Sequence, residues 1–76
     1  MAKKYNVVGP QIRKIRYQNG LTQEQLVARC ARVGLDITRS ALAKIEARTR
    51  NVNDSELIGL SKALQVKLEQ FLPPHR

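Results

Sequence analysis

Residues 22–46 predict two short amphipathic helices joined by a turn, with the rest of the chain packed around them. Thr22 and Gln25 have the spacing of a capping box, in which each side chain satisfies a free backbone N–H at a helix start. Gly34 ends the first of these helices, and Thr38 is a typical N-cap for the second. We therefore expect a rigid helix pair whose second member has a small, basic and hydroxyl-bearing outer face.

Apolar residues recur at helical spacing along the chain and predict an all-α fold. The expected helices span residues 10–19, 22–33, 38–47, 53–64 and 67–72. Asn53 and Glu56 repeat the capping-box spacing, and Gly20 is the expected left-handed cap of the first helix. Gly59, inside the fourth helix, either permits a close helix approach or is simply tolerated there.

These five helices bring enough apolar side chains together for one core. The expected core residues are Ile12, Ile15, Leu21, Leu26, Val27, Cys30, Ile37, Leu42, Ile45, Leu57, Leu60, Leu64, Val66, Leu68 and Phe71. Val33 is placed on the buried face of the second helix, and Leu72 beside Phe71 on the core. The chain then divides into an N-terminal arm (residues 1–8), a compact five-helix domain (residues 9–72) and a C-terminal tail (residues 73–76).

The chain is strongly basic: its 76 residues include 14 Lys and Arg against 6 Asp and Glu, a formal net charge of +8. The basic residues are spread over the whole sequence, so they predict a charged surface rather than a charged tail. Such a surface attracts nucleic acid or an anionic membrane. No expected helix combines a strongly basic face with a broad apolar face, which argues against membrane binding. Because no signal peptide or transmembrane segment is expected, we predict a cytoplasmic protein.

The residue types give little support to catalysis. His75, the single histidine, lies beside the C-terminus, and the carboxylates are scattered along the chain. Cys30, the single cysteine, follows the apolar spacing of its helix and fits a thiol in the core. We therefore expect no enzymatic activity and no cofactor, metal or small-molecule ligand.

Two charged residues are placed beside apolar stripes. Arg16 lies about 40° from Ile12 around its helix, and Glu46 lies about 40° from Leu42. A charge next to the core is costly unless it is paired. We therefore expect a structural ion pair between Arg16 and Glu46 that joins the first helix to the third.

The outer face of the helix that follows Thr38 suits the DNA major groove. Base-edge contacts are expected from Arg39, Ser40, Ala43 and Lys44. Arg39 can bridge O6 and N7 of guanine, Lys44 can reach the same acceptors, and Ala43 permits a close approach. The same spacing also fits an ordinary solvated helix face.

Phosphate contacts are expected where helix starts and basic segments offer donors. The start of the helix over residues 22–33 has free N–H groups and the positive end of the helix dipole. A basic loop follows the third helix, and the arm contains two lysines. The expected phosphate contacts are Thr22, Gln23, Thr38, Arg48, Arg50, Lys3 and Lys4.

In this order, the residues resemble the lambda-repressor-like helix-turn-helix family of the Cro/repressor (XRE) type. The resemblance rests on Arg16, on residues 20–27 (GLTQEQLV), on residues 38–46 (TRSALAKIE) and on the leucine pattern of residues 57–68. It implies a five-helix DNA-binding domain and a phosphate contact by Gln23. It also implies base reading by Arg39, Ser40 and Lys44, and it supports the link between Arg16 and Glu46. Members of the family usually bind two half-sites as homodimers.

The sequence departs from the family pattern at three places. The second helix and the turn are lengthened, at about residues 29–35. Arg48 stands where many members have glycine, and a left-handed conformation there would cost roughly 1 kcal/mol. Gln65 replaces the usual cap glycine near the end of the fourth helix.

We therefore expect a sequence-specific double-stranded DNA-binding protein, a transcriptional regulator that reads the major groove with its third helix. One alternative is a protein-interaction module of the same fold, an antitoxin or adaptor, with weak or non-specific DNA binding. Another is RNA binding, which usually stacks bases on aromatic side chains. Tyr5, Tyr17 and Phe71 are the only aromatic residues and are widely separated, which argues against RNA.

Overall fold

The computed structural model describes residues 7–72, which form four α-helices and one turn of 3-10 helix. The elements are α1 (Gly9–Gln18), α2 (Gln23–Arg32), α3 (Arg39–Glu46), α4 (Asp54–Leu64) and η1 (Leu68–Phe71). Since residues 7–72 contain no strand, the predicted all-α class is confirmed. The expected fifth α-helix is instead the single turn η1.

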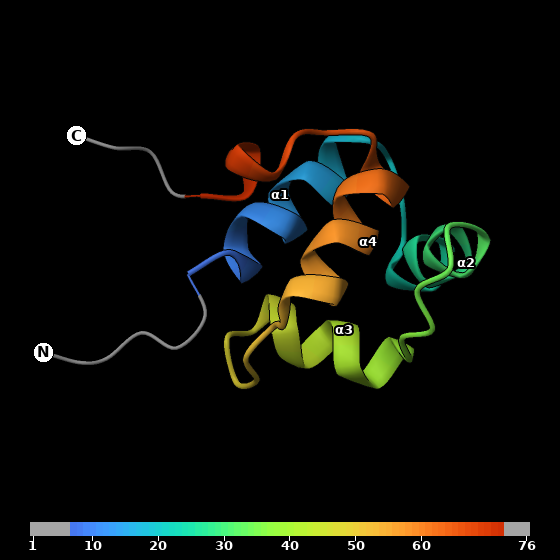
Figure 1. The fold of residues 1–76 in the computed structure, drawn as a ribbon. Helices are drawn as coiled ribbons and strands as arrows, with labels where there is room; N and C mark the ends of the chain where they lie inside the picture. Colours follow the sequence, from blue (N-terminus) through green and yellow to red (C-terminus); the bar gives the residue numbers. More distant parts are fainter. Residues whose placement is uncertain (1–6, 73–76) are drawn as a thin grey trace, which may run out of the picture.

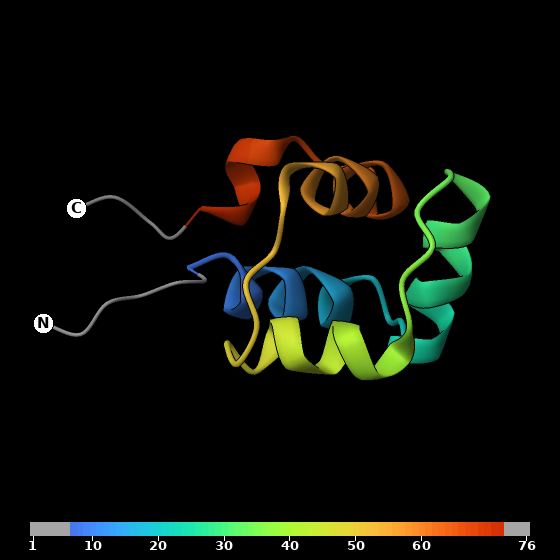
Figure 2. The ribbon, with the colours of Figure 1, turned by 60° about the horizontal axis from the view of Figure 1, so that its bottom comes forward.

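The helices pack so that α3 lies at an outer edge of the molecule. Figure 2 shows α1 between α3 on one side and α4 with η1 on the other, while α2 stands across one end. There α2 contacts both α3 and α4, whereas η1 contacts α1 and α4. Figure 1 shows the same arrangement from a second direction, with α2 at the end away from η1.

The helix starts are fixed by side chains close in sequence. Thr22 accepts a hydrogen bond from the backbone N–H of Gln25 (3.0 Å), and the Gln25 side chain accepts one from the N–H of Thr22 (2.9 Å). Asn53 and Glu56 form the same reciprocal pair at the start of α4. Thr38 caps α3 through the N–H of Ala41. Each cap is worth about 1 kcal/mol, and all three predicted starts are confirmed.

Each of the four α-helices ends with a residue in the left-handed conformation. These residues are Gly20 (φ 68°), Gly34 (φ 90°), Arg48 (φ 65°) and Gln65 (φ 58°). At every end, the N–H of the following residue donates to the carbonyl five positions back, which is the Schellman closure. Glycine suits this conformation, but Arg48 and Gln65 carry a Cβ that crowds the next carbonyl.

The core lies where α1, α2, α3, α4 and η1 meet. The fully buried apolar residues are Ile12, Leu26, Cys30, Leu42, Ile45, Leu60 and Phe71. The expectation that Leu68 and Leu72 pack on the core is wrong, because these residues are 47% and 56% exposed. A single four-residue 3-10 turn spans only about 8 Å, and here Phe71 is its one buried side chain. Val33 is also exposed, because it caps α2 where the chain leaves the helix axis.

A close approach joins the turn after α2 to α4. Gly59 in α4 is buried, and a Cβ placed on it would lie 2.7 Å from the Cβ of Leu35. That separation is too short for two carbon atoms that are not bonded. The glycine therefore permits this contact, which helps to fix the segment of residues 33–38 that leads into α3.

Candidate nucleic-acid interface

The two faces of α3 differ sharply in burial. Leu42 and Ile45 are fully buried against the core, while Arg39, Ser40 and Lys44 are exposed. The spacing of these residues around the helix produces this division, because each residue advances about 100°. The exposed face thus presents a guanidinium and a hydroxyl group in the first turn of α3 and an ammonium group in its last turn. The structure brings these three predicted base readers onto one surface.

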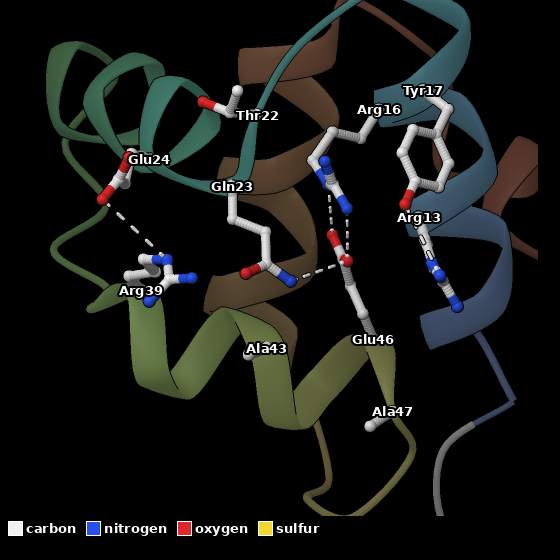
Figure 3. A pocket seen from close by; sticks show the side chains of 10 residues that line it. All are labelled: Arg13, Arg16, Tyr17, Thr22, Gln23, Glu24, Arg39, Ala43, Glu46 and Ala47. Atoms are coloured by element: carbon white, nitrogen blue, oxygen red, sulfur yellow. Dashed lines mark hydrogen bonds and ion pairs between the residues drawn. The ribbon is translucent and has the colours of Figure 1, made fainter.

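Two small side chains lie between the exposed face of α3 and the neighbouring helices. Ala43 is half-buried, and Ala47 just beyond α3 is exposed. Both line a hollow of about 560 Å³ that opens between α1, α2 and α3 (Figure 3). The hollow exists because neither alanine extends far enough to fill the space beside α3.

Arg16 and Glu46 form a buried ion pair at the base of this hollow. Nε of Arg16 donates to Oε2 of Glu46 at 2.7 Å, and Nη2 donates to Oε1 at 2.8 Å. Nη1 of Arg16 also donates to the carbonyl of Leu21 at 2.8 Å. The hydrogen bonds that Arg16 donates to Glu46 raise the pKa of Arg16 above its usual value, and burial opposes that shift. The pair ties α1 to the last residue of α3.

Gln23, the first residue of α2, joins the same network. Its side-chain nitrogen donates to Oε1 of Glu46 at 3.1 Å (Figure 3). Gln23 is half-buried, and its side-chain amide has two N–H donors, of which the bond to Glu46 uses one. The contact with Glu46 was absent from the sequence-based predictions, because it joins residues on different helices.

Arg39 has an acidic neighbour on α2. Its Nε lies 4.0 Å from Oε2 of Glu24, and both side chains are largely exposed. An exposed ion pair of this length contributes little to stability. It does place Arg39 beside the start of α2, so the exposed residue at the start of α3 and the start of α2 lie next to each other (Figure 3).

The basic loop after α3 is joined to α4 through Arg50. Arg50 forms two hydrogen bonds to the Glu56 carboxylate (3.0 and 2.7 Å) and one to the carbonyl of Asn51. These bonds lower the pKa of Glu56. The guanidinium of Arg50 therefore holds the loop to α4, and its expected phosphate contact stays a prediction. Arg48, in the same loop, is exposed.

The remaining predicted phosphate contacts lie at different places. The Thr22 and Thr38 hydroxyls accept the capping bonds of α2 and α3, and both residues are exposed. Lys3 and Lys4 fall outside the described residues.

None of the helices in residues 7–72 has the length and apolar character that a membrane span requires.

One side of the hollow is formed by Arg13 and Tyr17, which are not among the expected DNA contacts. Tyr17 on α1 is exposed, and its hydroxyl accepts a hydrogen bond from Arg13 at 3.4 Å (Figure 3). The guanidinium carbons of Arg13 and Arg16 lie 5.4 and 4.7 Å from the centre of its ring. This hydrogen bond is the main reason why the pKa of Tyr17 is lowered. The spacing of Arg13 and Tyr17, one helical turn apart, was the available sequence signal.

These features define a helical DNA-binding domain in which α2 and α3 form a helix-turn-helix. The comparison with protein families agrees, because the helix-turn-helix family model matches residues 12–71. The chain belongs to this family, in its XRE-type, lambda-repressor-like branch. Its members are DNA-binding transcriptional regulators and are generally not enzymes. Searches of curated proteins and of solved structures found no significant match.

Proposed function

We propose that this protein is a sequence-specific regulator that reads double-stranded DNA by inserting α3 into the major groove. The observation that carries the proposal is the exposed face of α3, where Arg39, Ser40 and Lys44 gather opposite a fully buried apolar face. An α-helix fits the major groove, and such side chains match the acceptors on base edges. Ala43 allows the helix backbone to come close to a base pair.

The proposed phosphate contacts surround this helix. Gln23 and Thr22 stand at the start of α2, where free N–H groups and the helix dipole favour an anion. Thr38 stands at the start of α3, and Arg48 in the loop after it. In this arrangement Arg16 and Glu46 hold the helices in place and do not contact a base.

The direct test is a selection from random duplex DNA, repeated at two salt concentrations. An enriched motif is expected from the unmodified protein, and binding without one would contradict the proposal. On the selected site, Arg39→Ala and Lys44→Ala should each relax the preference at one base pair by about 1–3 kcal/mol. Gln23→Ala should instead weaken binding on all sequences alike. If both α3 variants keep the full preference, α3 is not the reading element.

The exposed apolar side chains of η1 favour a second candidate function. Leu68 and Leu72 stand on the surface at the end of the domain, where a protein partner or a second copy of the chain could cover them. Homodimerisation on DNA fits the first proposal, and a protein-interaction module fits the second. Analytical sedimentation would distinguish the two candidate functions. It would compare three samples: the protein alone, the protein with a duplex that carries one half-site, and the protein with a duplex that carries two. A dimer on the longer duplex supports regulation through paired half-sites.

A further inference from the structure

The α1 side of the hollow presents a cation and a hydroxyl together. Arg13 and Tyr17 are both exposed and lie one helical turn apart on α1. Their side chains meet at 3.4 Å, so the hydroxyl oxygen and the guanidinium face the same space (Figure 3). The Tyr17 oxygen accepts the bond from Arg13, which leaves the hydroxyl hydrogen to donate elsewhere.

The two arginines beside Tyr17 differ in how their charge is used. Arg16 is neutralised by Glu46 at 2.7 Å. No carboxylate among residues 7–72 lies within ion-pair distance of Arg13. Arg13 therefore carries positive charge at the edge of the hollow with no carboxylate of the described residues beside it. The Tyr17 ring covers the Arg16 guanidinium and is held in place by it, because a cation over a ring face is attracted to it.

The position of the hollow decides which anion could reach this pair. The major groove is about 12 Å wide, and a helix with its side chains is about 10–12 Å across. A helix in the groove is therefore flanked on each side by a sugar-phosphate strand. One flank of α3 is the hollow, since Arg39, Ala43 and Ala47 line it. The strand on that flank would run over the hollow and meet its α1 side.

We propose that Arg13 and Tyr17 bind one phosphodiester group of the DNA backbone at the α1 side of the hollow. This inference rests on the proposed insertion of α3 into the major groove. The guanidinium supplies the charge, and the Tyr17 hydroxyl donates to a second oxygen of the same phosphate. The site extends the phosphate contacts from the start of α2 to α1, on the strand next to Ala43 and Ala47.

The test uses Arg13→Gln and Tyr17→Phe in the full chain, with Arg32→Gln as the matched control. Arg32 is an exposed arginine in the last turn of α2, outside the hollow, so its replacement removes the same charge elsewhere. Arg13→Gln should lower the slope of log K against log salt concentration by about 0.9, whereas the control should leave that slope unchanged. Tyr17→Phe should weaken binding about tenfold, because it loses a hydrogen bond to a charged group. Thermal melting should remain as in the unmodified protein.

Single neutral methylphosphonate substitutions in the selected duplex then locate the phosphate. In the unmodified protein, one substitution should weaken binding, and in the Arg13→Gln Tyr17→Phe double variant the same substitution should have no further effect. Equal sensitivity of both proteins at every position, with unchanged salt slopes, would overturn this inference alone. Loss of sequence preference in the unmodified protein would instead overturn the proposed function.

Discussion

The substitution Glu46→Gln removes the charge that joins α1, α2 and α3. In the folded protein the carboxylate accepts two hydrogen bonds from Arg16 and one from Gln23. The side chains of Arg16 and Glu46 are only 6% and 3% exposed, so water cannot replace the lost partner. Glutamine keeps one acceptor oxygen, but an NH2 group takes the place of the other. This NH2 group would face an N–H donor, with which it cannot form a hydrogen bond.

The expected cost follows from the buried charge that is left behind. Removing one partner of a buried ion pair typically destabilises a protein by about 3–5 kcal/mol. In a domain of this size, each kcal/mol shifts the melting temperature by about 4–8 °C. Glu46→Gln should therefore lower the melting temperature by about 12 °C or more. Glu24→Gln, a charge removal on the surface, should change stability by less than about 0.5 kcal/mol.

Thermal and urea unfolding followed by circular dichroism measure this cost. A second variant, Arg16→Met with Glu46→Leu, separates the buried charge from the packing. It should recover much of the loss, because apolar side chains of similar volume leave no unpaired charge. If Glu46→Gln costs less than about 1 kcal/mol, the pair does not hold the helices together. If the double variant is no more stable than the single one, the unpaired charge is not the cause.

Three further predictions concern stability. Arg48→Gly should stabilise the protein by roughly 0.5–1 kcal/mol, because relief of the left-handed strain exceeds the added freedom of the unfolded chain; a lower melting temperature would contradict this. Gly59→Ala should destabilise it by about 1–3 kcal/mol through the clash with Leu35, and Leu35→Ala in the same chain should remove only the part of that penalty that comes from Cγ and Cδ2 of Leu35, because alanine keeps the Cβ. Arg50 lowers the pKa of Glu56 in the folded protein. The stabilisation from ionised Glu56 is therefore fully present above the pKa that Glu56 has in the unfolded chain, and it is lost as the pH falls through the lower pKa of the folded protein. Glu56→Gln should therefore be less stable at pH 7 and lose less stability between pH 5 and pH 3, as urea midpoints would report.

Features set by neighbouring residues could be predicted from the sequence. The capping partners of α2 and α4 lie three positions apart, so their hydrogen bonds depend on little else. The pairing of Arg16 with Glu46 could also be predicted, because a helical wheel places each charge beside an apolar stripe. That inference needed only the rule that charges near a core are paired.

Features that depend on how segments meet in space were beyond the sequence. The ion pair between Arg50 and Glu56 was not predicted, because it depends on the path of the folded loop. Leu68 was placed in the core by its apolar type, yet the short turn η1 leaves it exposed. The contact between Gln23 and Glu46 joins two helices, and no periodicity along the chain reports it.

The position of Glu46 has a consequence for how long the proposed complex lasts. Glu46 is the last residue of α3, and its carboxylate is bonded to residues on α1 and α2. These bonds restrain α3 from tilting independently of the helices beside it, so in the proposed complex little conformational entropy is lost on binding. We expect the net charge of +8 to drive association, at a similar rate for right and wrong sites. A mismatch that the helix cannot relieve by tilting shortens the residence time, so discrimination between sites lies in the dissociation rate.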